Sequence, residues 1–355
     1  METRIQKLRQ QFDRLNIDAF LINRLSNIRY FCGYSGSNGL LIITRDNSFF
    51  ITDFRYQEQI KRQVKGAETF IYKKDFPTEF KENPKLHFKG KIGYEAPFLT
   101  VDLFNKMKDA LPACEWISTE NIAEEIASVK DADELSLIQT AVKITDQVFT
   151  EILPLINPGL TESEIAAEIV YRHIRLGAAG NSFDSIIASG VNSSLPHAGA
   201  TEKKIEKGDF VTLDFGCVYK GYCSDMTRTV IVGKPTAKQK EIYDLVLKAQ
   251  TAGVEACKAG ISGKAVDKVA RDIIAAAGYG EYFGHGLGHG LGIEVHAHPR
   301  VSFLFDHTLY ANQVVTIEPG VYLPDWGGVR IEDDVVIKEN GYVNLTKSKK
   351  ELIIL

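Results

Sequence analysis

The chain has 355 residues, of which 44% are hydrophobic and 25% are charged, and its net charge is −4 with a pI near 6.1. These values are those of an average globular protein, so they exclude a disordered or collagen-like chain and provide no basic surface for nucleic acid. The length predicts roughly two domains of about 100–200 residues each.

The sequence also argues against membrane proteins and disulfide scaffolds. No apolar run approaches the roughly 18–20 residues that span a bilayer, and the first twenty residues carry charges instead of the apolar core of a signal peptide. The five cysteines are an odd number without a CxxC pair, which indicates buried free thiols in a reducing compartment. We therefore expect a cytoplasmic protein with no membrane partner.

The first part of the chain predicts a small α/β domain, because helical and strand-like apolar patterns alternate along it. The elements that we expect are a helix at 3–15, a strand at 18–23, a hairpin at 39–44 and 48–52, a strand at 91–95 and a helix at 100–111. A polar stretch at 118–133 follows, and we place the domain boundary within it, after residue 125.

The second domain is expected at 126–355. It begins with a long amphipathic helix from Ala132 through Val148. Thr161 and Glu164 have the spacing of a capping box ahead of a further helix at 165–175. Beyond about residue 183 the sequence becomes strand-rich and glycine-rich, so the whole chain is predicted to be α+β.

Two strands in this region predict that Asp214 and Asp225 lie together. If residues 210–216 and 224–231 form a hairpin with a two-residue turn, facing residues have numbers that sum to an odd value. Both aspartates then lie on one face, opposed or one rung apart. Buried like charges are destabilising unless a proton or a cation neutralises them, and a metal ion is the natural choice. The alternative is that one aspartate points to solvent beside the turn.

Histidines follow in a glycine-rich setting. The segment 284–292 reads GHGLGHGLG and contains His285 and His289, and His296 lies seven residues further on. Glycine permits tight turns and close approach of the backbone to a ligand, which a packed core histidine does not require. These histidines are therefore predicted to belong to a binding site.

Glu318 and Glu332 provide two more carboxylates. Glu332 lies on a strand predicted at 329–337. Residues 322–327, which resemble a hairpin turn, join this strand to the segment of Glu318, so both glutamates can converge on the aspartate pair. Four carboxylates and one imidazole balance two divalent cations. The donor set suits Mn²⁺, Co²⁺ or Zn²⁺ better than copper, and the histidine disfavours Mg²⁺. We predict two divalent ions, with Mn²⁺ as the first choice and Co²⁺ or Zn²⁺ as alternatives.

In this order and context, the five residues resemble the ligands of the pita-bread metallopeptidases. That family includes methionine aminopeptidase, aminopeptidase P and prolidase, with creatinase as a metal-free relative. The matching contexts are LDFG for Asp214, SDMTRT for Asp225, GHGLG for His289, IEPG for Glu318 and RIED for Glu332. The resemblance spans about residues 130–355 and implies a C-terminal pita-bread (creatinase/aminopeptidase) fold.

The N-terminal part is similar to the creatinase-like domain that aminopeptidase P and prolidase carry and methionine aminopeptidase lacks. The similar segments are YSGSNG at 34–39 and ITDFRY at 51–56. This resemblance narrows the expected substrate to peptides with proline at the second position.

The resemblance also implies how the metal ligands divide. Asp225 and Glu332 would bridge the two ions, Asp214 would chelate one of them, and His289 with Glu318 would complete the other. Glu318 would in addition be the general base and proton carrier.

Further residues are implied to contact the substrate or to support the ligands. His296 would donate to the carbonyl oxygen of the scissile bond, and His197 would lie beside the substrate. His285, Arg330 and Asp333 would support the ligands, with Arg330 paired to a ligand carboxylate. From the residues alone, the alternatives are that His197 is a simple loop histidine and that Arg330 is a surface strand residue.

Arg300 is the candidate for binding a free substrate carboxylate bidentately, as a dipeptidase requires. A solvated loop arginine is the alternative for this residue.

These observations predict a metal-dependent exopeptidase that hydrolyses the Xaa-Pro bond of dipeptides or short peptides, in a homodimer by resemblance to its relatives. Aminopeptidase P activity on longer peptides is the alternative. Methionine aminopeptidase is disfavoured by the N-terminal domain, and a non-catalytic binding protein is disfavoured by the complete set of ligands.

Overall fold

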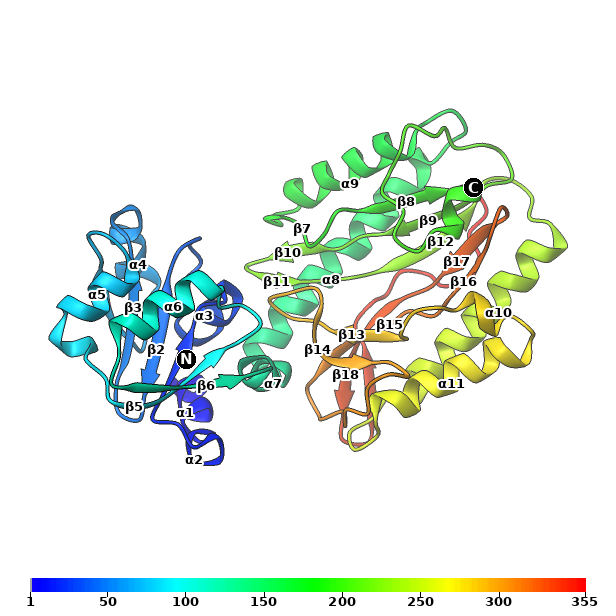
Figure 1. The fold of residues 1–355 in the computed structure, drawn as a ribbon. Coiled ribbons are helices and arrows are strands. Elements are labelled where there is room, and N and C mark those ends of the chain that lie inside the picture. Colours follow the sequence, from blue (N-terminus) through cyan, green and yellow to red (C-terminus); the bar gives the residue numbers. More distant parts are fainter. Residues whose placement is uncertain (1) are drawn as a thin grey trace. The chain divides into compact units, whose positions relative to one another are not determined.

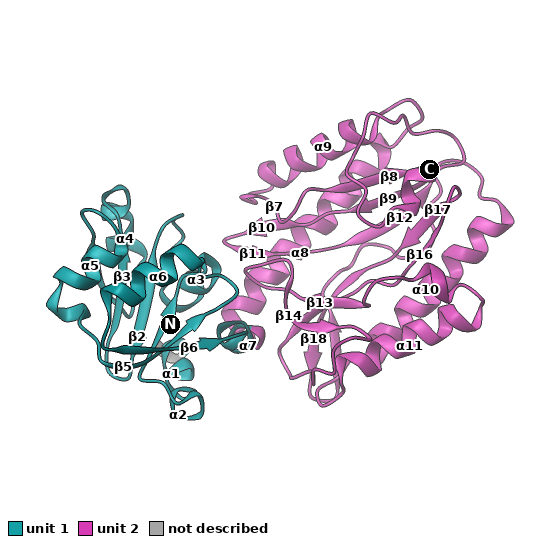
Figure 2. Ribbon diagram, viewed as in Figure 1, with its two compact units in different colours: residues 1–127 teal, residues 128–355 magenta. Residues whose placement is uncertain are grey.

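The computed structural model describes residues 2–355, and their side chains from residue 4 onward. The chain divides into two compact units, residues 1–127 and residues 128–355 (Figure 2). None of the helices among the described residues is both long enough and apolar enough to cross a bilayer.

Unit 1 is built on one mixed sheet with the strand order β4-β3-β2-β1-β5-β6. Its strands are β1 (Ala19–Ile22), β2 (Leu40–Thr44), β3 (Ser48–Thr52), β4 (Glu68–Ile71), β5 (Gly90–Glu95) and β6 (Cys114–Thr119). Its helices are α1 (Glu2–Arg9), α2 (Phe12–Leu15), α3 (Leu25–Cys32), α4 (Gln57–Gln63), α5 (Phe76–Glu82), α6 (Val101–Ala110) and α7 (Ile122–Ser128), which ends at the junction. The neighbouring interior strands β1, β2 and β3 are almost wholly buried, as expected for apolar runs covered on both faces.

The predicted hairpin is confirmed, with Leu40 opposite Ile51 in the ladder between β2 and β3. The single helix predicted at 3–15 is wrong. The chain tightens where the Gln11 N–H donates to the Leu8 carbonyl, three residues back, and α2 then ends at Asn16 in the left-handed conformation. Helix α7 lies within the polar stretch at 118–133, for which no helix was predicted.

Unit 2 contains four long helices around short sheets. Helices α8 (Ala132–Ile152) and α9 (Glu162–Arg175) are capped by Asp131 and Thr161, each in a capping box, as predicted for the second. They pack on β7 (Gly180–Asn181), β8 (Ile186–Ser189), β9 (Phe210–Asp214), β10 (Cys217–Tyr219), β11 (Tyr222–Cys223) and β12 (Thr227–Ile231). We call this part the first half of unit 2.

The second half of unit 2 contains α10 (Ala237–Glu255) and α11 (Gly263–Ala276), which lie side by side in Figure 1, across the unit from α9. They pack on the β13 (Gly288–Gly290), β14 (Ala297–Val301), β15 (Val314–Ile317), β16 (Gly320–Leu323), β17 (Gly327–Arg330), β18 (Asp333–Lys338) and β19 (Gly341–Asn344) strands. The prediction that this region is mainly strand is wrong for these helices. Each buries one apolar face, as an amphipathic helix does.

The hairpin predicted for the aspartates forms with a two-residue turn at Lys220 and Gly221. Both have positive φ, of 46° and 87°, which is the geometry of a turn that matches the strand twist. Asp214 lies opposite Thr227, so the register is odd, as predicted. Asp225 therefore lies one rung from Asp214 on the same face.

Candidate functional site

Four of the five candidate metal ligands lie at the ends of strands or in breaks between them, and the fifth, His289, is the middle residue of β13. Asp214 ends β9, Asp225 precedes β12, and Glu318 directly follows β15. Glu332 lies between β17 and β18, which belong to different sheets, so the continuous strand predicted at 329–337 is wrong. At such positions a side chain can turn inward, because the backbone is not fixed by a continuous ladder.

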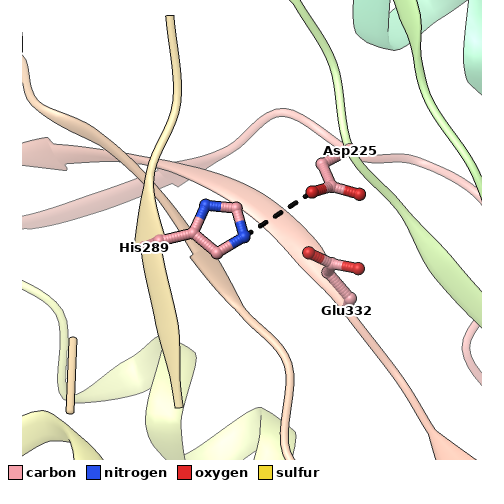
Figure 3. A group of neighbouring side chains, drawn as sticks. All are labelled: Asp225, His289 and Glu332. Carbon is pink, nitrogen blue, oxygen red and sulfur yellow. Dashed lines mark ion pairs between the residues drawn. The ribbon is translucent and has the colours of Figure 1, made fainter. Parts of the chain in front are cut away.

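Asp225, His289 and Glu332 form a compact cluster, and their ligand atoms all lie within 4.8 Å of one another. Figure 3 shows the imidazole of His289 directed at the two carboxylates. Its Nε2 lies 3.7 Å from Asp225 Oδ2 and 3.3 Å from Glu318 Oε1. The structure thus brings four of the five predicted ligands to one point.

Asp214 lies beside this cluster, where its Oδ2 accepts a hydrogen bond of 2.5 Å from Arg330 Nη2. Asp214 and Asp225 are only 8% and 5% exposed, which excludes the alternative that one of them points to solvent. Arg330 is 3% exposed and is therefore no surface residue.

The electrostatics of the cluster favour a bound cation. Asp214 Oδ1, Asp225 Oδ1 and Glu332 Oε1 are buried and have no hydrogen-bond partner among the described residues. Burial raises the pKa of Asp225 and of Glu332 well above the usual values, and the neighbouring carboxylates raise each further. A divalent cation would neutralise these charges and satisfy the free oxygens, so the residues fit a metal site.

His289 has the protonation state that a metal ligand needs. Burial, followed by the neighbouring His296, lowers its pKa to about 3, so the ring is neutral at neutral pH. Its Nδ1 lies 3.1 Å from the carbonyl oxygen of Gly290 and therefore carries the proton. The lone pair of Nε2 then points at the carboxylate cluster, as in histidine metal sites whose second nitrogen is fixed by a carbonyl.

Two threonines that the sequence interpretation did not single out hold the glutamates. Thr227 Oγ1 donates to Glu332 Oε2 at 2.6 Å, and Thr316 Oγ1 donates to Glu318 Oε1 at 3.1 Å. Both threonines belong to the motifs around the ligands, TRT and TIEP, so their nearness in sequence was the available signal. Their hydroxyls fix which carboxylate oxygen remains available for a metal.

A hydrogen-bonded chain runs from Asp214 through Arg330 and Tyr322 to His285. Arg330 Nη1 donates to the Tyr322 hydroxyl at 2.8 Å, and that hydroxyl lies 2.9 Å from His285 Nε2. Burial and the Arg330 charge lower the pKa of His285 to about 4, so the neutral ring accepts from the tyrosine. Arg330 thus contacts the ligand Asp214 directly, and His285 is joined to it through Tyr322, a residue whose role no motif indicated.

Asp333 points away from the cluster. It pairs with Arg228 and Lys350, and Arg228 also donates to the carbonyl oxygen of Glu332. Asp334, which was not singled out, accepts from the Asp225 N–H at 3.0 Å. The two residues after Glu332 thus hold the backbone on either side of the cluster.

A pocket of about 770 Å³ opens on the cluster. His197, His296 and Arg300 line it together with the five predicted ligands. Arg300 lies directly opposite His289 in the ladder between β13 and β14, so both side chains are on the same face. Among the described residues, no hydrogen bond or ion pair fixes the side chains of His197, His296 or Arg300.

This fold and site are those of a metallopeptidase. A model of metallopeptidase family M24 matches residues 136–339, and a model of the creatinase/prolidase N-terminal domain matches residues 4–129. The chain belongs to the M24 metallopeptidases. The resemblance recognised from the motifs is confirmed, as is the predicted fold class, an α+β chain with a creatinase-like domain before a pita-bread domain.

Several relatives are similar over nearly the whole chain. A Xaa-Pro dipeptidase of Pyrococcus horikoshii is 38% identical over 99% of both chains. A solved Xaa-Pro dipeptidase structure from Bacillus anthracis is 44% identical and has a TM-score of 0.96, with 99% of each chain covered. A solved X-Pro aminopeptidase structure from Thermotoga maritima is 38% identical over 98% of this chain and 100% of that one, with a TM-score of 0.89.

Proposed function

We propose that this protein is a Xaa-Pro dipeptidase that uses two divalent ions, with Mn²⁺ as the first choice. The observation that carries the dipeptide preference is the position of Arg300. Arg300 lines the pocket and lies opposite His289 in the ladder, and no carboxylate among the described residues forms an ion pair with it. A dipeptide ending in proline would bring a free carboxylate to this guanidinium, and the names of two similar proteins support the same substrate.

Asp214, Asp225, His289, Glu318 and Glu332 would hold the ions. When bound, divalent ions supply Lewis-acid polarisation and activation of water for attack on a carbonyl. Glu318 would accept the proton of the attacking water and deliver it to the proline nitrogen as the bond breaks.

The two pocket histidines would act on the substrate itself. The centroids of the His296 and His289 rings are 4.4 Å apart, and this nearness supports His296 as the donor to the oxygen that would become negative during the reaction. His197 would orient the proline side of the substrate. Arg300 would hold the terminal carboxylate.

Aminopeptidase P activity is the second candidate. The pocket, at about 770 Å³, has room for more than a dipeptide, and the Thermotoga X-Pro aminopeptidase shares 38% of its residues with this chain. Hydrolysis of Ala-Pro and of Ala-Pro-Ala, measured with metal-stripped protein with and without Mn²⁺, separates the candidates. We expect metal-dependent cleavage of Ala-Pro alone; cleavage of the tripeptide at a similar rate would favour aminopeptidase P, and no metal-dependent cleavage would contradict both.

Arg300→Ala tests the carboxylate clamp directly. We expect kcat/KM for Ala-Pro to fall by about 10–100-fold, since a charge-assisted hydrogen bond contributes about 1.5–3 kcal/mol. Any residual tripeptide cleavage should be nearly unchanged. Arg175→Ala, which removes an exposed arginine of α9, is the matched control and should leave both rates unchanged. An equal loss on both peptides in Arg300→Ala would show that Arg300 has no role in reading the carboxylate.

We also propose that the two units are the predicted domains, with their junction near residues 125–128, and that the protein is a cytoplasmic homodimer. The support for the compartment is the state of the five cysteines, all of them in the described part of the chain and all free. The support for the dimer is the resemblance to dimeric relatives, and sedimentation at several protein concentrations tests it.

A further inference from the structure

We propose that Glu162 is a positioning residue for His197, because its buried carboxylate ties together both ends of the loop that carries this histidine. The loop, residues 190–200, runs from the end of β8 back to the start of α9. The inference rests on the proposed function only where it concerns activity. The hydrogen bonds that join both ends of the loop to Glu162 are a property of the fold.

One oxygen of Glu162 holds the start of the loop. Glu162 Oε1 accepts from the Ser189 N–H at 2.6 Å and from the Ser189 hydroxyl at 2.8 Å. The amide of Asn192, inside the loop, lies 3.1 Å from Oε1 and 3.2 Å from Oε2. The last residue of β8 and the first turn of the loop are thus bound to one carboxylate.

The other oxygen holds the end of the loop. Glu162 Oε2 accepts from the Thr201 N–H at 3.1 Å and from the Thr201 hydroxyl at 2.5 Å. The backbone of α9 reinforces this contact, since the Ser163 N–H donates to the Thr201 carbonyl at 3.0 Å. Both ends of the loop therefore meet at the N-terminus of α9.

Glu162 is completely buried, and a buried carboxylate is costly unless donors surround it. Here Ser189, which belongs to β8, donates only to Oε1, whereas every donor to Oε2 comes from Asn192 or Thr201. Opening the loop and its Thr201 end would leave Oε2 buried without a donor. This dependence makes the closed loop the strongly preferred state.

The far side of the loop is joined to the residues behind the metal ligands. Arg330 Nη1 donates to the Pro196 carbonyl at 3.1 Å, directly before His197, and the Gly328 N–H donates to Ser193 Oγ at 2.9 Å. The imidazole of His197 is exposed and makes no hydrogen bond to any described residue. The loop backbone alone therefore sets where the ring lies, and Glu162 with Arg330 sets the backbone.

Two substitutions test the tie. Glu162→Gln replaces an acceptor by an amide whose NH₂ faces existing donors, and Thr201→Val removes one hydroxyl donor while leaving the carboxylate intact. Asp146→Asn is the matched control: Asp146 accepts from the Lys347 and Ser348 N–H groups and from the Ser348 hydroxyl, so it ties a different segment.

The first readout is hydrogen exchange of the full-length protein and does not depend on activity. In Glu162→Gln the amides of residues 190–200 should exchange about 10-fold faster or more, with a smaller change in Thr201→Val and none in Asp146→Asn. Unchanged exchange of this loop in both variants would overturn the proposal, whether or not the wild-type protein cleaves Xaa-Pro peptides.

The second readout is a double-mutant cycle with His197→Ala on Ala-Pro hydrolysis. Glu162→Gln should lower kcat/KM by about 10–100-fold in the wild-type background and by less than about 2-fold in His197→Ala, because its effect passes through that ring. Asp146→Asn should change kcat/KM by the same factor in the wild type and in His197→Ala, whatever the size of that factor. An equal loss from Glu162→Gln in both backgrounds would show a general structural role and overturn the positioning claim.

Discussion

The pocket has two sides that differ in how firmly the protein holds them. On the ligand side, Asp214, Glu318 and Glu332 each accept a hydrogen bond from a neighbouring side chain, and Asp225 is held through its backbone by Asp334. On the substrate side, His197, His296 and Arg300 are exposed and lack hydrogen-bond partners among the described residues. Hydrogen bonds therefore fix the ligand side directly, whereas the side chains of the substrate side are positioned only through their backbone.

The difference predicts that substitutions on the ligand side reduce activity more than substitutions on the substrate side. Asp225→Asn should cause the largest loss. It removes one of the charges that a cation would balance, so metal content and activity should both fall, activity by on the order of 10³-fold or more. The metal-free variant should unfold at a higher temperature than the metal-free wild type, because a buried repulsion is relieved. Metal analysis, kinetics and thermal unfolding check this; full metal content with normal activity would contradict the ligand assignment.

Arg330→Lys should have an intermediate effect. Lysine keeps the charge but loses the fork that reaches Asp214, Tyr322 and Pro196 together. We expect kcat/KM to fall by about 10–100-fold, in the range found when partners of metal ligands are removed. A normal rate would mean that charge alone suffices and that the hydrogen-bonded chain to His285 is not required.

Glu95→Gln extends the comparison to a buried carboxylate of unit 1 that lies outside the candidate metal site. It accepts from the Asn23 and Arg24 N–H groups and from Asn27. Burial nevertheless raises its pKa to about 7, above the ordinary glutamate value of 4.5. The folded protein therefore binds this proton more tightly than the unfolded chain does.

The stability that Glu95 contributes should be fully present below pH 4.5 and lost as the pH rises through about 7. The whole effect is at most about 3 kcal/mol. Chemical denaturation across this range should show a smaller decline in Glu95→Gln than in the wild type, with activity unchanged. Equal pH dependence in the two proteins would mean that the three donors keep Glu95 ionised in the folded state.

Much of this molecule could be predicted from sequence where one local pattern decides the structure. The hairpin around residues 45–47, the capping box at Thr161 and the odd register that pairs Asp214 with Asp225 follow from turn chemistry and alternation. Helix α10 was not predicted, because the glycine-rich segments on either side of it favoured strands and turns for the whole region beyond residue 183. The break of the predicted strand at Glu332 was also not visible, since it depends on β17 and β18 pairing in different sheets.

The same limit applies to the site. Motifs drew attention to the residues that would contact metal or substrate, because their spacing is distinctive. Tyr322 and Glu162 could not be found in this way, since each acts on residues that are distant in the chain and neighbours only in the fold. Thr227 and Thr316 are an intermediate case. Each is two residues from a ligand in the sequence, but no pattern of its own indicated its role.

The ligands are drawn from both halves of unit 2: Asp214 and Asp225 from the half with α8 and α9, and His289 and Glu318 from the half with α10 and α11. An ion bound among them would act as a cross-link that closes long stretches of chain. Closing long loops removes much conformational entropy from the unfolded state. The ions that would activate water would therefore also stabilise the packing of the two halves against each other. Loss of metal should therefore expose the chain between the halves to proteases before any other part of unit 2.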